Sequence, residues 1–172
     1  MTRAVAYLNK HGIPYDMLEY EHREKGAVYA SQAIGMAPER TAKTLIVQLS
    51  HRGYLVVLMP GDKSIPFKEL ARVYEVKRAS MVDAETAERL SGYQIGGISP
   101  FGMSRSLPVA VDSDLLKHET IAVNGGKRGL MLRMRPSDIV GGTGADVVRL
   151  HPDVGDGDES SSFGSESPVR NH

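Results

Sequence analysis

Thr44-Leu45-Ile46-Val47-Gln48-Leu49 and Tyr54-Leu55-Val56-Val57-Leu58-Met59 are two nearly continuous apolar runs, separated by the four residues Ser50-His51-Arg52-Gly53. Two such runs, joined by a short polar segment that ends in glycine, are typical of a β-hairpin. Because neither run alternates regularly with polar residues, we expect the hairpin to lie within a sheet that is covered on both faces.

Further helices and strands alternate on either side of this hairpin. Before it, the sequence predicts a helix over 2–11, a strand over 13–20 and a short helix that ends at Gly35. After it, the expected elements are helices over 66–74 and 84–90, strands over 109–112, 120–123 and 130–134, a helical turn over 136–140 and a last strand over 146–150. This mixture predicts an α/β fold: a single compact domain over residues 1–150, with one mixed, curved, barrel-like β-sheet and surrounding helices.

Residues 151–172 differ in composition from the rest of the chain. They are rich in Ser, Gly and Asp, and they hold five of the 21 acidic residues but one of the 21 basic ones. Such a segment buries too little apolar surface to offset its ordering entropy, so we expect a disordered acidic tail. Residues 1–150 are left with a net charge of +4, which suits transient contact with a polyanion.

Several classes of protein are excluded by what the sequence lacks. It has no cysteine, so disulfides, a cysteine nucleophile and a thiolate metal site are impossible. The six histidines are scattered without a close pair at ligand spacing, and we expect neither a metal nor a cofactor. No apolar run approaches the roughly 20 residues that cross a bilayer, and the N-terminus turns polar too early for a signal peptide. We therefore expect a soluble, cytoplasmic protein that does not contact a membrane.

The first candidate for chemistry is the segment 40–44, in which Lys43 enters the most apolar strand. A lysine at the mouth of a buried sheet can hold a phosphate or polarise a carbonyl group. The alternative is a lysine that extends from the strand end into solvent. No Gly-x-x-x-x-Gly-Lys pattern precedes Lys43, which excludes a P-loop.

Two glycine-rich segments are the other candidates. Residues 92–102 include Gly96-Gly97-Ile98-Ser99-Pro100, whose free N–H groups could form a cradle for an anion or an oxyanion; the alternative is an ordinary connection. Residues 124–129 include Gly125-Gly126-Lys127-Arg128, which offers backbone donors and two cations that could reach phosphates. Here the alternative is a hairpin turn with two solvated charges.

Neither a Gly-x-Ser-x-Gly elbow nor a His-Glu-x-x-His motif is present. A hydrolase built from these segments must therefore position its substrate and stabilise charge, leaving the attack to water or to groups of the substrate. An aminoacyl ester suits this scheme, because it is an activated acyl donor beside a ribose hydroxyl.

In their order and spacing these segments resemble the YbaK/ProX family of aminoacyl-tRNA deacylases, which includes the editing domain inserted in some prolyl-tRNA synthetases. The resemblance covers roughly residues 1–150. It is carried by four motifs: Tyr20-Glu21-His22, Lys43-Thr44-Leu45, Gly96-Gly97-Ile98-Ser99-Pro100-Phe101-Gly102 and Gly125-Gly126-Lys127-Arg128-Gly129-Leu130. It implies the family's compact α/β domain around a mixed, barrel-like sheet.

The resemblance also implies roles for individual residues. Lys43 stands at the place of the family's essential lysine, which holds the 3′-terminal nucleotide of the tRNA, and Gly96 to Pro100 matches the Gly-x-x-x-Pro loop whose backbone lines the aminoacyl pocket. Tyr20 matches a tyrosine beside that pocket. The catalytic set is therefore expected to be Lys43, Gly96, Gly97, Ile98, Ser99 and Pro100, and the substrate-binding set Tyr20, Thr44, Gly125, Gly126, Lys127 and Arg128.

Three features depart from the family pattern. Met131 replaces an acidic residue that is common in its Cys-tRNA deacylases, Asn124 replaces a frequent serine, and the segment between His22 and Lys43 is shorter than in many members. The expected function is an editing hydrolase that acts in trans on the acceptor end of mischarged tRNA, either Cys-tRNA(Pro) or Ala-tRNA(Pro), with prolyl-tRNA synthetase as a further candidate partner. The alternative, which Met131 favours, is a non-catalytic adaptor that binds an aminoacyl or nucleotide ligand and docks on a synthetase.

Overall fold

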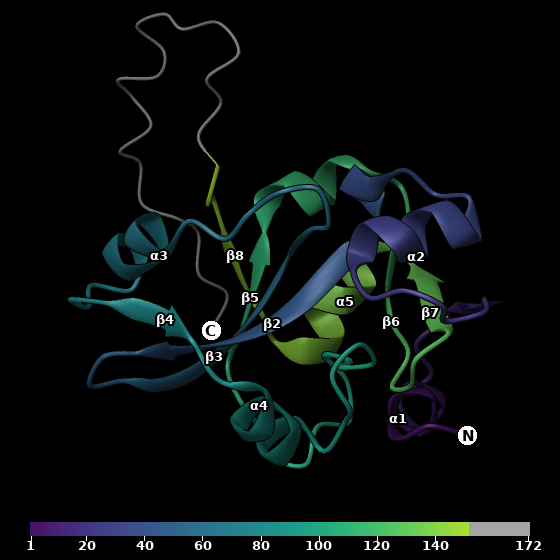
Figure 1. The fold of residues 1–172 in the computed structure, drawn as a ribbon, viewed down its shortest axis with the longest axis horizontal. Coiled ribbons are helices and arrows are strands. Elements are labelled where there is room, and N and C mark those ends of the chain that lie inside the picture. Colours follow the sequence, from purple (N-terminus) through teal and green to yellow (C-terminus); the bar gives the residue numbers. More distant parts are fainter. Residues whose placement is uncertain (152–172) are drawn as a thin grey trace, which may run out of the picture.

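The strands form two sheets in the computed structural model, which describes residues 1–151 (Figure 1). The five-stranded sheet is mixed, because β3 pairs antiparallel with β2 and parallel with β5. Its order is β4 (Ala79–Met81), β2 (Ala42–Leu49), β3 (Gly53–Pro60), β5 (Val109–Asp112) and β8 (Asp146–Val148). The three-stranded sheet is antiparallel, with the order β1 (Asp16–Glu19), β7 (Leu130–Met134) and β6 (Ile121–Asn124).

The predicted hairpin is confirmed as β2 and β3. The two strands pair along their whole length, from Ala42 opposite Pro60 to Leu49 opposite Gly53. β3 lies between β2 and β5, and its last six residues are all buried. Because side chains alternate between the faces of a strand, Ala42 and Ile46 face one core while Val47 and Leu49 face another.

Within residues 1–151, five α-helices surround the sheets, and each was expected from the sequence. They are α1 (Arg3–Lys10), α2 (Ala27–Ile34), α3 (Phe67–Val73), α4 (Ala84–Ser91) and α5 (Pro136–Thr143). The side chains of Thr2 and Asp83 cap the first turns of α1 and α4. α2 and α4 end at Gly35 and Gly92, both in the left-handed conformation that glycine adopts without strain. Three short elements were not predicted: β4 and the 3-10 helices η1 (Pro38–Arg40) and η2 (Ser113–Lys117).

Three apolar clusters hold these elements together. The largest lies between the two sheets and includes residues of α1, α4 and α5. A second covers the opposite face of the five-stranded sheet, where Leu70 and Val73 of α3 pack on Leu55 and Val57. The third joins α2 to the three-stranded sheet through Ala30, Ala122 and Met131. These contacts place α2 near the first residues of β2, where a cavity opens.

The mixed α/β fold agrees with the prediction, but the strands do not form one continuous barrel-like sheet. In the described part of the chain, a single parallel bridge between Thr41 and Ala122 links the two sheets, and neither sheet is closed. β4 pairs only with residues 47–49 of β2. The edge of β2 between Ala42 and Ile46, at residues 43–45, therefore faces a cavity instead of another strand.

The described chain ends in ordered contacts at Leu150, which is buried, and His151, which bonds to Asp112. The expected acidic tail falls, apart from His151, outside the described residues. Within residues 1–151, none of the helices has the length and the apolar character that a bilayer crossing requires.

Candidate functional site

A cavity of about 360 Å³ opens between the edge of β2, helix α2 and the glycine-rich segment that follows α4. Five of the predicted site residues line it: Tyr20, Lys43, Thr44, Gly96 and Ile98. The cationic residue at the start of β2 and the backbone near position 98 thus face the same space. The cavity is completed by His22, Lys25, Gly26, Ala27, Ala30, Ala42, Leu45, Ile46, Met81, Val82, Ala84, Ala87, Ile95, Asn124 and Met131.

Lys43 gives this cavity a cation without a neutralising partner. Within residues 1–151, no carboxylate lies within 4 Å of its ammonium group, and no Asp or Glu lines the cavity. Burial lowers the pKa of Lys43, and the negative charge of Asp62 opposes this shift. A half-buried lysine in an acid-free cavity is suited to binding an anion such as a phosphate.

Thr44 lines the cavity at the open edge of β2. Backbone groups alternate between the two edges of a strand, and the Ile46 carbonyl accepts a hydrogen bond from the Val82 N–H (3.3 Å) at the edge away from β3. The N–H and C=O of Thr44 therefore point to that same open edge. The Thr44 hydroxyl is buried and has no hydrogen-bond partner among the described residues.

The first glycine segment is anchored at two points and leaves two amides free. The Gly97 N–H donates to the Gln94 carbonyl (2.9 Å), and the Ile95 N–H donates to Glu88 Oε2 on α4 (2.9 Å). The N–H groups of Gly96 and Ile98 have no partner within residues 1–151, and both residues line the cavity. Two fixed, unpaired donors are what an oxyanion site requires.

Ser99 and Pro100 are buried and do not line this cavity. Ser99 Oγ accepts a hydrogen bond from the Phe101 N–H (3.2 Å), and the Tyr93 hydroxyl donates to the Phe101 carbonyl. These contacts fix the turn that follows Ile98. The structure therefore gives the two predicted catalytic residues Ser99 and Pro100 a supporting position.

The second glycine segment lies against the first one. Arg128 Nε donates to the Ile95 carbonyl (2.8 Å), and a Cβ atom on Gly97 would lie 2.8 Å from Lys127 Cα. Thr2 Oγ1 of the α1 cap donates to the Gly125 carbonyl (2.6 Å). Gly125, Gly126, Lys127 and Arg128 do not line the cavity, so in this structure they support the first segment from outside.

His22 is the main site residue that the sequence reasoning left out of its catalytic and binding sets. It lines the cavity, and its Nδ1 atom is buried without a hydrogen-bond partner among the described residues. The Tyr20-Glu21-His22 motif contained the signal for it. Tyr20 lies nearby, with 6.4 Å between the ring centroids, and burial raises the pKa of its phenol.

A second polar cluster lies at the β5–β8 side of the same five-stranded sheet and was also missed. His151 Nδ1 lies 3.1 Å from Asp112 Oδ2, and His151 Nε2 lies 3.1 Å from the Ser64 carbonyl. Asp114 contributes its N–H to Asp112 Oδ1 (3.0 Å) and its carboxylate to an ion pair with Lys117 (3.0 Å). Asp112, Asp114 and His151 could each offer one atom to a metal ion. Their polar atoms are already engaged with one another and with the surrounding chain.

The fold and the cavity together define an α/β domain that brings a cation and free backbone amides to one cavity. The family model of the aminoacyl-tRNA editing domain matches residues 23–141, and the chain belongs to this family.

Its relatives agree with this assignment. The chain is 27% identical over 151 residues to EbsC of Enterococcus faecalis, a proposed Cys-tRNA(Pro)/Cys-tRNA(Cys) deacylase, across 87% of this chain and 92% of the relative. It is 26% identical over 106 residues to a proline–tRNA ligase of Geobacillus kaustophilus, across 62% of this chain and 18% of that enzyme.

Among solved structures, a proposed trans-editing enzyme for prolyl-tRNA synthetase matches with a TM-score of 0.79 and 26% identity, over 86% of this chain and 94% of that chain. The structure of the hypothetical protein APE2540 has the same fold, with a TM-score of 0.79 and 24% identity, over 86% of this chain and 98% of that chain.

Proposed function

We propose that this protein is an aminoacyl-tRNA deacylase that acts in trans on the acceptor end of mischarged tRNA. The observation that supports this most directly is the cavity, which combines the unpaired ammonium of Lys43 with the free N–H groups of Gly96 and Ile98. The 3′ end of an aminoacyl-tRNA carries the matching groups, a phosphate and an ester carbonyl. Membership of the editing-domain family supports the same substrate class.

In this proposal Lys43 binds the terminal phosphate and fixes the position of the nucleotide. The N–H groups of Gly96 and Ile98 donate to the ester carbonyl oxygen, and these hydrogen bonds strengthen as the oxygen becomes an oxyanion. One such donor typically contributes about a hundredfold to a thousandfold in rate. Attack comes from water, from water aided by the neighbouring ribose hydroxyl, or from the substrate's own side chain. The acyl carbon–oxygen bond breaks, and the ribose oxygen leaves with a proton.

Cysteine and alanine on tRNA(Pro) are the proposed substrates. The part of the cavity formed by Ala30, Ala42, Ile46, Ile98 and Met131 presents methyl and methylene groups, and this wall suits a small uncharged side chain. The names of two relatives, which refer to Cys-tRNA(Pro) and to prolyl-tRNA synthetase, support tRNA(Pro) as the carrier. Editing is needed for such side chains, because a binding pocket discriminates by only about 1–3 kcal/mol per methylene.

The test is a deacylation assay with Cys-tRNA(Pro), Ala-tRNA(Pro), Pro-tRNA(Pro) and Cys-tRNA(Cys), in which released amino acid is measured. We expect release of cysteine or alanine from tRNA(Pro), while Pro-tRNA(Pro) stays charged. If no amino acid is released from any of these tRNAs while tRNA still binds, the deacylase is refuted and the non-catalytic adaptor is favoured.

A further inference from the structure

We propose that the backbone carbonyl of Thr44 accepts a hydrogen bond from the α-amino group of the aminoacyl ester. This inference rests on the proposed function and deepens it, because it names the part of the substrate that amino acids share. The site would then select acyl groups that carry a hydrogen-bond donor on the α carbon. The same contact would fix the rotation of the acyl group beside the amides of Gly96 and Ile98.

The first argument is that the cavity lies against the edge of β2, where the backbone groups point outward. All five consecutive residues from 42 to 46 line it. Side chains alternate between the two faces of a strand, so a cavity on one face would contact only every second residue. β3 pairs with β2 along the other edge over its whole length. The cavity therefore meets the backbone of β2 at the edge away from β3.

The second argument is that the hydrogen bonding of this edge is interrupted at Thr44. After Thr44, the Ile46 carbonyl accepts from the Val82 N–H (3.3 Å). Before it, Thr41 forms a bridge to Ala122 of β6. Between these contacts, the N–H and C=O of Thr44 have no partner within residues 1–151. Thr44 is only 8% exposed, and backbone groups withdrawn from water are normally paired. A ligand in the cavity can supply the missing partner.

The third argument is that an aminoacyl ester carries the groups that a partner strand would offer. A strand residue presents an N–H donor and a C=O acceptor at one edge, and recognition by addition to a sheet edge uses these main-chain groups. In an aminoacyl ester the α-amino nitrogen and the carbonyl group are joined through the α carbon, as in a peptide residue. The amine can therefore donate to the Thr44 carbonyl, while the Thr44 N–H faces the same space as the oxygens of the ester.

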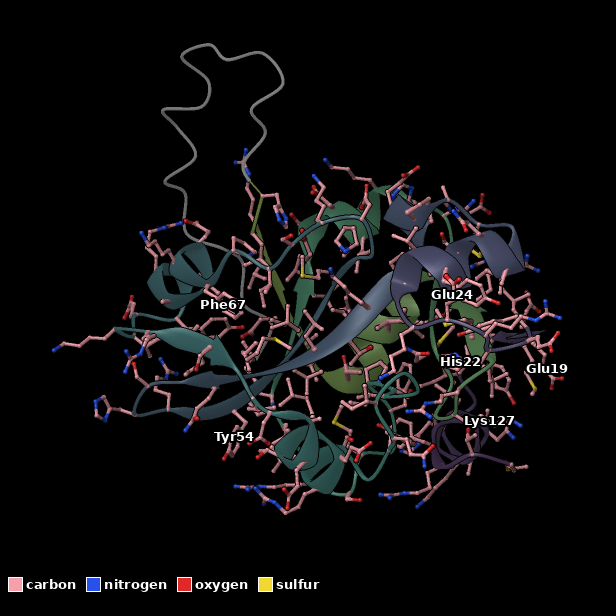
Figure 2. The ribbon with its side chains drawn as sticks, viewed as in Figure 1. Glu19, His22, Glu24, Tyr54, Phe67 and Lys127 are labelled. Atoms are coloured by element: carbon pink, nitrogen blue, oxygen red, sulfur yellow. The ribbon has the colours of Figure 1, made fainter. Side chains whose placement is uncertain are left out.

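The fourth argument is that the other groups of the cavity favour a carbonyl as the acceptor. No carboxylate lines the cavity in the described chain, whereas Lys25 and Lys43 are cations. Nearby cations lower the pKa of an amine, so they favour the neutral α-amino group, which needs no ionic partner. Figure 2 shows His22, which lines the cavity, between Glu24 and Lys127, and neither of these two charged residues lines it.

The first test compares Ala-tRNA(Pro) with tRNA(Pro) that carries lactic acid or propionic acid, in single-turnover deacylation. Lactate has a hydroxyl donor in place of the amine, and propionate has no donor. Each rate is divided by the rate of spontaneous hydrolysis, which corrects for the different reactivity of the esters. We expect the corrected rate for propionyl-tRNA to lie about ten- to a hundredfold below that for Ala-tRNA, because the Thr44 carbonyl is left unpaired. Lactyl-tRNA should lie between them. For Cys-tRNA(Pro), 3-mercaptopropionyl-tRNA is the corresponding probe without a donor.

Two variants assign the acceptor. Asn124 also lines the cavity, and its side-chain oxygen is the competing acceptor. We expect Asn124→Ala and Thr44→Val to keep the preference for the alanyl over the propionyl ester, because both variants retain the Thr44 carbonyl. Loss of the preference in Asn124→Ala would assign the amine to that side chain, and loss in Thr44→Val would assign it to the threonine hydroxyl. Either loss overturns the inference.

The carbonyl itself can be observed by NMR of the full chain labelled with ¹³C. Adenosine that carries alanine in a 3′-amide linkage should shift the Thr44 carbonyl carbon signal, and adenosine with propionate in the same linkage should shift it much less. The Ile46 carbonyl, already bonded to Val82, is the matched control and should not distinguish the two ligands. Equal shifts at Thr44, or equal corrected rates for the alanyl and propionyl esters, overturn the inference while the deacylase stands. If the protein releases no amino acid from any of the tRNAs, the proposed function fails and the inference fails with it.

Discussion

The cavity beside β2 and the Asp112–His151 cluster are both partly buried and polar, but they differ in how their polar groups are satisfied. In the cavity, Thr44 Oγ1 and His22 Nδ1 have no partner within residues 1–151. In the cluster, the Asp112 carboxylate accepts from the Asp114 N–H and contacts His151, which also contacts the Ser64 carbonyl. Buried polar groups are normally paired. The cluster therefore satisfies its polar groups within the described chain, whereas the cavity leaves two hydrogen-bonding atoms unused, as the proposed ligand site requires.

The electrostatics of the two regions differ in the same way. The cavity has two lysines and no acid among its described lining residues, whereas the cluster contains two aspartates, one of them fully buried. Burial raises the pKa of Asp112, and its hydrogen bonds from Asp114 and His151 oppose this shift. The ammonium group of Lys43, which has no ion-pair partner in the described chain, would gain a favourable interaction on binding an anion. The hydrogen bonds of Asp112 hold β5, η2 and the end of the chain together without a ligand.

Replacing Lys43 with alanine should have the largest effect on activity. Truncating one partner of a charged hydrogen bond typically costs 2 kcal/mol or more, so we expect kcat/KM for mischarged tRNA(Pro) to fall by at least about thirtyfold. The melting temperature should stay within about 2 °C, because the ammonium has no ion-pair partner to lose in the described chain. Full activity of Lys43→Ala would remove this lysine from the mechanism.

Gly97→Ala should have the next largest effect. The added methyl group would lie 2.8 Å from Lys127 Cα and C, so the two glycine segments must move apart. A displacement of about 1 Å can cost about a hundredfold in rate, and we expect kcat to fall by roughly ten- to a hundredfold. Gly141→Ala in α5 is the matched control, because its methyl group would meet no atom within 4 Å. Equal activity of both variants would show that the contact between the segments does not position the site.

Thr44→Val should change activity and stability in opposite directions. The substitution removes a buried, unpaired hydroxyl and keeps the shape of the side chain. Removing such a group should raise the free energy of unfolding by about 1 kcal/mol, while the loss of one neutral hydrogen bond to the substrate should lower kcat/KM by up to about tenfold. Urea unfolding and deacylation kinetics measure the two effects. A less stable variant with unchanged kinetics would mean that the hydroxyl serves the fold.

Substitutions in the Asp112–His151 cluster should lower stability and leave deacylation unchanged. Asp112→Ala leaves the Asp114 N–H and His151 without their acceptor, and we expect a loss of about 1–3 kcal/mol in the free energy of unfolding with unchanged deacylation. Asp112→Asn can keep both hydrogen bonds and should lose less. Loss of deacylation by a folded Asp112→Asn variant would contradict the separation of the two regions.

The stability of the unmodified protein and that of Asp112→Asn should depend differently on pH. Because burial raises the pKa of Asp112, the folded state favours the protonated carboxyl, and its contribution to stability is lost as the pH rises through the folded-state pKa. Asp112→Asn cannot ionise and should lack this loss. The stability of Asp112→Asn relative to the unmodified protein should therefore rise as the pH increases above the ordinary range of aspartate. Denaturation curves from pH 4 to 7 test the prediction, and a constant difference would refute it.

Shortening the chain should have the smallest effect. A chain that ends at His151 keeps the contacts with Asp112 and Ser64, and we expect both its activity and its stability to equal those of the full chain. A chain that ends at Leu150 loses these contacts and should be less stable by about 1 kcal/mol. Loss of deacylation by the chain ending at His151 would show that residues 152–172 take part in function.

Local patterns were sufficient to predict the helices and the central hairpin, because periodicity, capping residues and glycine stops lie within a few positions of each other. The three residues of β4 are too few to show a period. The division into two sheets depends on the edge of β2, which no local pattern reveals. Lys43 and Gly96 could be predicted to share a site because each stands in a recognisable motif.

The remaining features depend on contacts between distant segments. Ala30 of α2 and Met131 of β7 reach the cavity only through the packing of α2 on the three-stranded sheet. Asp112 and His151 are 39 positions apart, and neither stands in a motif. The supporting position of Lys127 and Arg128, which the sequence suggested as direct phosphate ligands, follows from the packing of one glycine segment on the other.

The most direct test of this account is an NMR titration of the full chain with adenosine that carries alanine in a non-hydrolysable 3′-amide linkage. If the unpaired groups of the cavity bind the acceptor end, the backbone amide signals of Thr44, Gly96 and Ile98 and the ring signals of His22 will shift as the ligand is added, while those of Asp112 and His151 stay in place. Shifts at Asp112 and His151 with an unchanged cavity would contradict the account.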